Sequence, residues 1–159
     1  MPNHCYQQVH VYGPRFLVKE LYDRLSTETP EFCQVILPMP FEQWLAPKSR
    51  LHGYEVEGWY EWRVTNWGTK WDVVDVEMTQ SLLLHDDEED TEPFSMNASF
   101  SFNCWTAWSP PVPVWDKLVE MGLSVDADYQ DEGMMFEGTY LNGEDKCWEP
   151  EDVLDEEDA

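Results

Sequence analysis

The stretch MNASFSFN, residues 96–103, alternates apolar and polar side chains without interruption. In a β-strand successive side chains point to opposite faces, so Met96, Phe100 and Phe102 would share one face and the asparagines and serines the other. A strand with one apolar and one polar face is typical of an antiparallel sheet that is covered on one side only. The stretch therefore predicts a sheet with helices packed on its apolar face.

The rest of the chain supplies the other elements of this fold. Residues 14–26 and 112–121 carry apolar residues at helical spacing, and Pro14 suits the first turn of the first helix. A small helical insertion is predicted around residues 59–68, where Gly68 would supply a left-handed cap. This order of elements predicts an α+β domain. Further strands are predicted at residues 8–13, 33–37, 74–79, 125–130 and 134–140.

One compact domain is expected to account for most of the chain. At 159 residues and 42% hydrophobic content, the sequence is long enough to bury a core without disulfides or metal. The domain is predicted to span residues 1–143, and residues 144–159 are predicted to form an acidic tail. No uncharged apolar run approaches the roughly 18 residues needed to span a bilayer, and no secretory signal is found. A cytoplasmic location is therefore expected.

Four of the fourteen residues in WYEWRVTNWGTKWD, residues 59–72, are tryptophans. A tryptophan buries a large apolar area and needs a partner only for its indole N–H, which favours a place in the core between helices and sheet. The alternative is a groove that binds a small ligand. Base stacking through these rings would require a cationic track beside them, and the sequence has none.

Four stretches of the sequence are distinctive: MPNHCYQQVHVYGP at residues 1–14, LPMP at 37–40, WYEWRVTNWGTKWD at 59–72 and FSFNCWTAWSPP at 100–111. In these stretches the chain resembles the YubB-like, ferredoxin-like proteins that are encoded on plasmids and bacteriophages. The resemblance extends over residues 1–141 and leaves out the acidic tail. It implies a ferredoxin-like fold and a mobile-element origin, and it implies no particular activity.

Sequence motifs for catalysis, metal binding or cofactor binding are absent. The chain contains no Gly-rich phosphate loop, no G-x-S-x-G, no H-E-x-x-H, and no H-x-E with P-C-x-x-C. Its four cysteines lie far apart and form no C-x-x-C pair, so reduced thiols are expected. The sequence therefore predicts a protein that is not an enzyme and needs no cofactor or metal.

Acidic residues dominate the second half of the chain. The net charge is −24, from 33 acids and 9 bases, and residues 72–159 hold 25 of the acids but only two of the bases. A field of this size repels nucleic acid and anionic membranes, and it favours a basic partner. The acids fall on the polar side of predicted strands, in a loop at residues 86–92 and in the tail. The candidate partner-binding residues are Asp75, Glu77, Asp86, Asp87, Glu88, Glu89, Asp90, Asp126, Asp128, Asp131, Glu132, Glu137, Glu151, Asp152, Asp155 and Glu156.

The spacing of these acids favours one function over two others. Asp126 and Asp128 are two residues apart on a predicted strand, which separates them by about 6.8 Å, twice the roughly 3.4 Å phosphate repeat of one DNA strand. We therefore predict a DNA mimic that blocks a basic nucleic-acid-binding surface. The plasmid and phage origin that the resemblance implies points to a bacterial host defence protein as the target, either a CRISPR effector or a restriction enzyme. The alternatives are an acidic protein-interaction module without DNA mimicry and a small-ligand-binding domain that uses the tryptophans.

Overall fold

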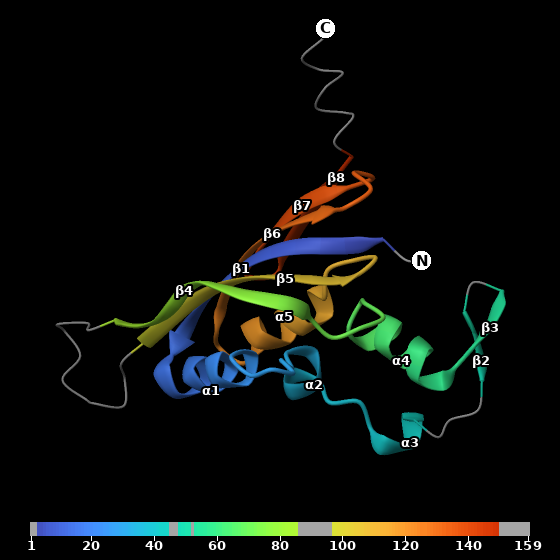
Figure 1. Ribbon diagram of the computed structural model, residues 1–159, viewed down its shortest axis with the longest axis horizontal. Coiled ribbons are helices and arrows are strands. Elements are labelled where there is room, and N and C mark those ends of the chain that lie inside the picture. The colour runs from blue at the N-terminus through green and yellow to red at the C-terminus, as the bar shows by residue number, and fades with distance from the viewer. Residues whose placement is uncertain (1–2, 45–47, 52, 86–96, 150–159) are drawn as a thin grey trace, which may run out of the picture.

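A six-stranded antiparallel sheet covered by helices on one face forms the body of the protein (Figure 1). The computed structural model describes residues 3–44, 48–51, 53–85 and 97–149. The strand order is β4-β5-β1-β6-β7-β8, so the predicted α+β class is confirmed. The strands of this sheet are β1 (His4–Pro14), β4 (Val74–His85), β5 (Asn97–Ala107), β6 (Ser124–Asp131), β7 (Glu137–Leu141) and β8 (Glu144–Trp148).

The helices and a small second sheet complete the described elements. A two-stranded sheet joins β2 and β3 in the insertion between α3 and α4. None of the described helices has the length and apolar character required to traverse a bilayer. The bounds are α1 (Arg15–Leu25), α2 (Cys33–Ile36), α3 (Phe41–Trp44), β2 (Ser49–Leu51), β3 (Tyr54–Val56), α4 (Gly58–Asn66) and α5 (Val112–Glu120).

The core lies between the sheet and the helices, as the alternation in β5 predicted. Phe100 and Phe102 are at most 1% exposed and stack on one another with ring centroids 5.7 Å apart. The helix α1 buries Val18 and Leu21 against this layer, and α5 buries Trp115. Met96 of the predicted strand lies outside the described residues, and the strand itself begins at Asn97.

Pro14 and Gly68 lie at helix boundaries, as the sequence predicted. Pro14 is the N-cap residue of α1, so the helix begins one residue later than predicted. At the other boundary, α4 ends at Asn66, and Gly68 adopts φ +80°, the left-handed conformation expected of it. The Gly68 N–H donates to the carbonyl of Arg63, which closes the last turn of the helix.

The strand predicted at residues 33–37 is wrong, because this segment forms the helix α2. The cause is Asp72, whose carboxylate accepts the backbone N–H groups of Phe32 at 3.1 Å, Cys33 at 2.8 Å and Gln34 at 2.9 Å. These groups would otherwise lack partners at a helix N-terminus, so the carboxylate selects the helical conformation. Phe32, Cys33 and Ile36 then lie on one buried side of the turn.

The domain also extends beyond the boundary expected at residue 143. Residues 144–148 form β8, which pairs antiparallel with β7 at five positions. The hydroxyl of Tyr129 in β6 donates to Asp145 of β8 at 2.5 Å and ties the added strand to the sheet. Residues 150–159 of the predicted tail lie outside the described part of the chain. The last predicted hairpin strand starts at Glu137 rather than at residue 134.

Candidate functional site

The sheet has one face that no described helix covers, and we call it the open face. Side chains alternate along β1, β5 and β6 between a buried side, which packs against the helices, and this open side. In Figure 1 the described helices lie together on the opposite side of the sheet. The central residues of the open face are Tyr6, Gln8, His10 and Tyr12 of β1, Ser101, Asn103 and Trp105 of β5, and Asp126, Asp128 and Gln130 of β6.

Five of the predicted acids lie on the sheet in two separate groups. Asp126 and Asp128 are exposed on β6, and Glu137 is half-buried on the neighbouring strand β7. Asp75 and Glu77 are exposed on β4, an edge strand of the sheet. Two strands, β1 and β5, separate β4 from β6, so the two groups are about 14 Å apart at the usual strand spacing.

Asp131 was predicted to bind the partner, and this prediction is wrong because its side chain is buried. It is 3% exposed, and its carboxylate accepts the Met135 N–H at 3.1 Å within the turn between β6 and β7. Glu132 is exposed but engaged, since it accepts the backbone N–H of His4 at 3.0 Å and lies 3.4 Å from the His4 ring. The predicted sites Asp86, Asp87, Glu88, Glu89, Asp90, Glu151, Asp152, Asp155 and Glu156 lie outside the described residues.

The strands of the six-stranded sheet contain several acids and almost no bases. Lys146 is the one lysine or arginine within the strands of the six-stranded sheet. The described ion pairs of lysine and arginine all involve residues elsewhere, as in Lys19 with Asp23 and Arg24 with Glu20 on α1. Among the described residues, no lysine or arginine nitrogen lies within 4.0 Å of the carboxylates of Asp75, Glu77, Asp126, Asp128 or Glu137.

A row of three residues across the open face has the composition of a catalytic triad. His10 lies opposite Asp126 on one side and Ser101 on the other, and His10 Nδ1 is 2.6 Å from Ser101 Oγ. A triad requires the aspartate to hold the second ring nitrogen. No His10 nitrogen is within 4.0 Å of the Asp126 carboxylate in the described structure, so this row is not assembled as a triad. Nor do three of its His, Cys, Asp or Glu side chains gather anywhere in the described part to hold a metal ion.

The tryptophans of residues 59–72 belong mainly to the core, in line with the first of the two interpretations. Trp67 is 1% exposed and donates its indole N–H to the Leu37 carbonyl at 2.7 Å. Trp59 and Trp62 pack partly buried against the same core. Trp71 instead reaches the open face, where its ring lies 5.6 Å from the ring of His4.

Lys70 of the same stretch lies among aromatic rings. Its ammonium group is 5.3 Å from the ring centroid of Tyr60 and 5.7 Å from those of Trp71 and Trp108. Trp108 adopts φ +69°, a costly conformation for so bulky a residue. Cation–π attraction therefore connects Lys70, in the segment after α4, to the first turn of α4 and to the segment that follows β5.

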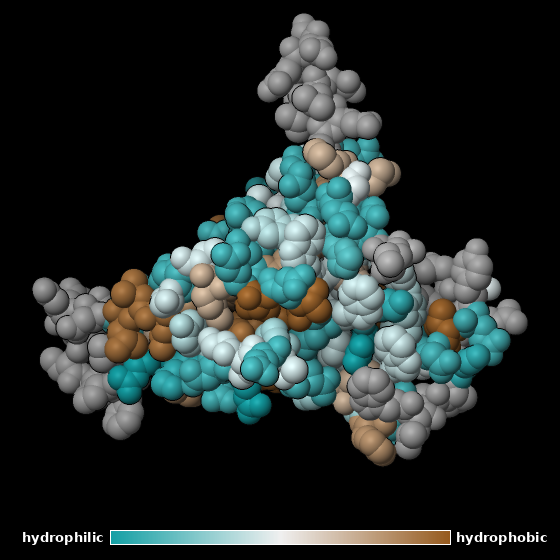
Figure 2. All heavy atoms as spheres, viewed as in Figure 1, coloured by the Kyte–Doolittle hydropathy of each residue, from teal (hydrophilic) through white to brown (hydrophobic). Residues whose placement is uncertain are grey.

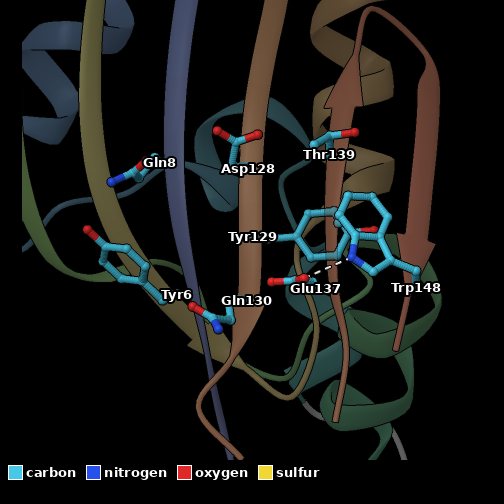
Figure 3. A pocket seen from close by; sticks show the side chains of 9 residues that line it. Tyr6, Gln8, Asp128, Tyr129, Gln130, Glu137, Thr139 and Trp148 are labelled. Carbon is cyan, nitrogen blue, oxygen red and sulfur yellow. Dashed lines mark hydrogen bonds between the residues drawn. The ribbon is translucent and has the colours of Figure 1, made fainter. Parts of the chain in front are cut away.

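A hollow of about 300 Å³ indents the open face where β1, β6, β7 and β8 lie side by side (Figure 3). The indole N–H of Trp148 donates to Glu137 at 2.8 Å along one wall. Figure 2 shows mainly hydrophilic side chains over β7 and β8, with a few apolar ones among them. Exposed Leu141 lies on β7, and exposed Leu83 and Leu84 lie on β4 at the opposite edge of the sheet. The hollow is lined by Tyr6, Gln8, Asp128, Tyr129, Gln130, Glu137, Gly138, Thr139 and Trp148.

Two buried tyrosines beneath the open face are bonded to carboxylates. The hydroxyl of Tyr140 donates to Asp116 of α5 at 2.7 Å, and that of Tyr129 donates to Asp145. Burial and then the hydrogen-bonded carboxylate raise the pKa of each tyrosine well above its ordinary value of 10.0. Both phenols therefore stay protonated in the folded protein at a pH where the unfolded chain releases their protons.

We expect the protein to lose stability as the pH rises above about 10, the pKa of an unperturbed tyrosine. Above that pH the unfolded chain binds fewer protons than the native state, so each tyrosine lowers the free energy of unfolding by about 1.4 kcal/mol per pH unit. Urea unfolding at pH 8, 10 and 11 measures this slope, and Tyr140→Phe should make it shallower. Tyr6→Phe on the open face is the matched control. An unchanged slope in the Tyr140 variant would contradict the assignment.

No family model, no curated protein and no solved structure matches this chain.

Proposed function

We propose that this protein is a DNA mimic that occupies the basic nucleic-acid-binding surface of a bacterial host defence protein. The observation that carries the proposal is the set of exposed carboxylates on the open face that have no lysine or arginine within ion-pair distance among the described residues. DNA-binding surfaces gain much of their affinity from lysines and arginines that meet phosphates and release counterions. A rigid array of unpaired carboxylates competes for the same cations.

The arrangement of the acids supports mimicry of a duplex. Asp126 and Asp128 point the same way from one strand, about 6.8 Å apart. Their group and that of Asp75 and Glu77 are separated by about 14 Å, which is comparable to the roughly 12 Å width of the DNA major groove. The sheet thus presents two acidic groups with a strip free of acids between them. We infer that these groups imitate the two phosphate backbones that border a major groove.

We also infer that the fold is ferredoxin-like, within the YubB-like family that the sequence resembles. The elements β1, α1, β4, β5, α5 and β6 follow in the order β-α-β-β-α-β. In the sheet the outer pair β4 and β6 flanks β5 and β1, and every neighbouring pair is antiparallel. The strands β7 and β8 would then be an extension of this unit, and the segment from α2 to α4 an insertion into it. The plasmid and phage origin of such proteins supports a host defence target in the bacterial cytoplasm.

A second candidate is an acidic interaction module that binds a basic protein without imitating DNA. The strip between the two acidic groups supports this second candidate. Its side chains include Gln8, His10 and Asn103, which do not resemble the phosphate groups of DNA. Neither candidate is an enzyme or needs a cofactor. A pocket built from the tryptophans of residues 59–72 is disfavoured, because Trp67 is in the core.

Competition with DNA separates the two candidates. A purified CRISPR effector complex and a purified restriction enzyme are each bound to a fluorescent DNA duplex, and the full-length protein is added at 50 mM and at 300 mM salt. A DNA mimic releases the duplex at the lower salt and much less at the higher salt, because its contacts are ionic. Binding to the protein–DNA complex without release of the duplex would favour the acidic module. Absence of binding to either machine at 50 mM salt would refute both defence targets.

A further inference from the structure

We propose that the hollow on the open face is a binding site for an arginine side chain of the partner. This proposal rests on the proposed function and adds the contact that the partner makes. The hollow brings together carboxylates, aromatic rings and side-chain amides from four strands, as Figure 3 shows. A hollow of about 300 Å³ is at the lower end of the range for small-molecule sites.

Two carboxylates give the hollow its charge. Asp128 lies opposite Thr139, and Gln130 lies opposite Glu137, so Asp128 and Glu137 are diagonal neighbours on adjacent strands. At this position their side chains start about 7 Å apart, close enough for one planar cation to reach both. One oxygen of Glu137 accepts the Trp148 indole N–H, which fixes the carboxylate and leaves its second oxygen for a ligand. The like charges repel each other until a cation lies between them.

A glycine beneath the hollow makes room for the Tyr129 ring. A Cβ atom at Gly138 would collide with the Tyr129 ring and with the Lys146 carbonyl. Glycine therefore allows Tyr129 to pass beneath β7 and reach Asp145 of β8. This bond holds β8, which carries Trp148, in place beside the hollow.

The remaining walls favour a guanidinium over an ammonium group. Trp148 is 37% exposed, and its indole presents an aromatic surface beside Glu137. Arginine stacks on such rings and donates five N–H groups in a plane, whereas lysine is a compact, strongly hydrated charge. The amide oxygens of Gln8 and Gln130 add neutral acceptors at the rim.

A second, smaller hollow continues the first toward β5. It shares Tyr6 and Gln130 with the first and adds Trp105, Glu132 and Met134. The rings of Tyr6 and Trp105 lie 5.0 Å apart and form a second aromatic surface. An extended segment that carries the arginine therefore has a path across the strands, and neighbouring residues of that segment would lie on Tyr6.

The test uses the full-length protein and two peptides, acetyl-Gly-Arg-Gly-Arg-Gly-amide and its lysine analogue. Titration at 50 mM salt is followed by the ¹⁵N-indole NMR signal of Trp148, assigned with Trp148→Phe. We expect the arginine peptide to shift this signal and to bind about 3-fold or more tightly than the lysine peptide. The double variant Asp128→Asn/Glu137→Gln, which keeps the shape of both side chains, should weaken binding by about 10-fold or more.

The control variant is Glu28→Gln/Glu31→Gln, which removes two exposed charges from the segment after α1. It should change the peptide affinity by less than about 2-fold, as expected for weak, screened interactions. Equal losses in the two double variants, or equal affinity for the two peptides, would overturn the arginine site. If the protein still competes with DNA but the Asp128→Asn/Glu137→Gln variant binds the peptide as the wild type does, the arginine site is wrong and the proposed function stands. If the peptide binds as expected but no DNA is released, the proposed function fails and the site remains.

Discussion

Replacement of Asp72 with alanine is expected to lower the free energy of unfolding by about 3 kcal/mol, because a charged acceptor of several backbone hydrogen bonds is lost. The carboxylate accepts three N–H groups at the start of α2 and a fourth from Val73 at 2.8 Å. Phe32 and Cys33 are fully buried, so their N–H groups cannot simply turn to water. Urea unfolding followed by far-UV circular dichroism measures the loss.

Two further variants separate the capping role of Asp72 from its charge. Asp72→Asn keeps one acceptor oxygen, and Oδ1 alone serves three of the four N–H groups, so the expected loss is only about 1 kcal/mol. Asp75→Asn is the matched control, because Asp75 is exposed and its φ of +52° is a conformation that asparagine tolerates. It should cost less than about 0.5 kcal/mol. A similar loss at both positions would show that net charge, not capping, governs stability.

Reversal of charge at Asp126 and Asp128 together is expected to weaken binding to the basic partner by about 100-fold at low salt. Asp126→Lys/Asp128→Lys places two cations in the middle of the open face, where they face the partner's own lysines and arginines. The measurement is the concentration of the variant that releases half of the DNA duplex in the competition assay. At 300 mM salt the difference from the wild type should shrink, because screening weakens exposed charges.

The matched control for this variant changes the total charge by the same amount elsewhere. Glu28→Lys/Glu31→Lys lies after α1 and outside the six-stranded sheet. Its release of DNA should remain within about 3-fold of the wild type, because distant exposed charges are screened. Circular dichroism and thermal unfolding establish beforehand whether each variant is folded. Equal weakening by the two variants would mean that the partner senses only net charge, and the mimicry proposal would then be wrong.

The parts of the fold that local alternation determines could be predicted from the sequence. β1, β5 and β6 each have one covered and one open side, and apolar and polar side chains alternate along them with a period of two. Residues 33–37 lack a decisive alternation of apolar and polar side chains, and a short apolar run suits either a strand or a buried helix. The choice is made by Asp72, 39 residues away from Cys33 in sequence. β8 was missed because its side chains are all exposed and it is held by backbone pairing with β7.

The candidate site could be predicted only in part. Asp126 and Asp128 are exposed as expected, because they follow the open register of β6. The same register places Asp131 on the buried side with Val125 and Ala127, so closer use of the period would have excluded it. Trp148 and Glu137 are eleven residues apart, and their contact depends on the pairing of β7 with β8. Periodicity within a strand carries no information about which strands become neighbours.

The strands of the six-stranded sheet hold several acids and a single base, Lys146, so this sheet carries a net negative charge. The other described lysines and arginines lie on the helices, in the insertion and in the segment after α4, where acids accompany them. Under the proposed function, the field of these carboxylates would attract a cationic partner and orient it toward the open face before contact. A larger fraction of collisions would then be productive, and capture of the partner would be fast.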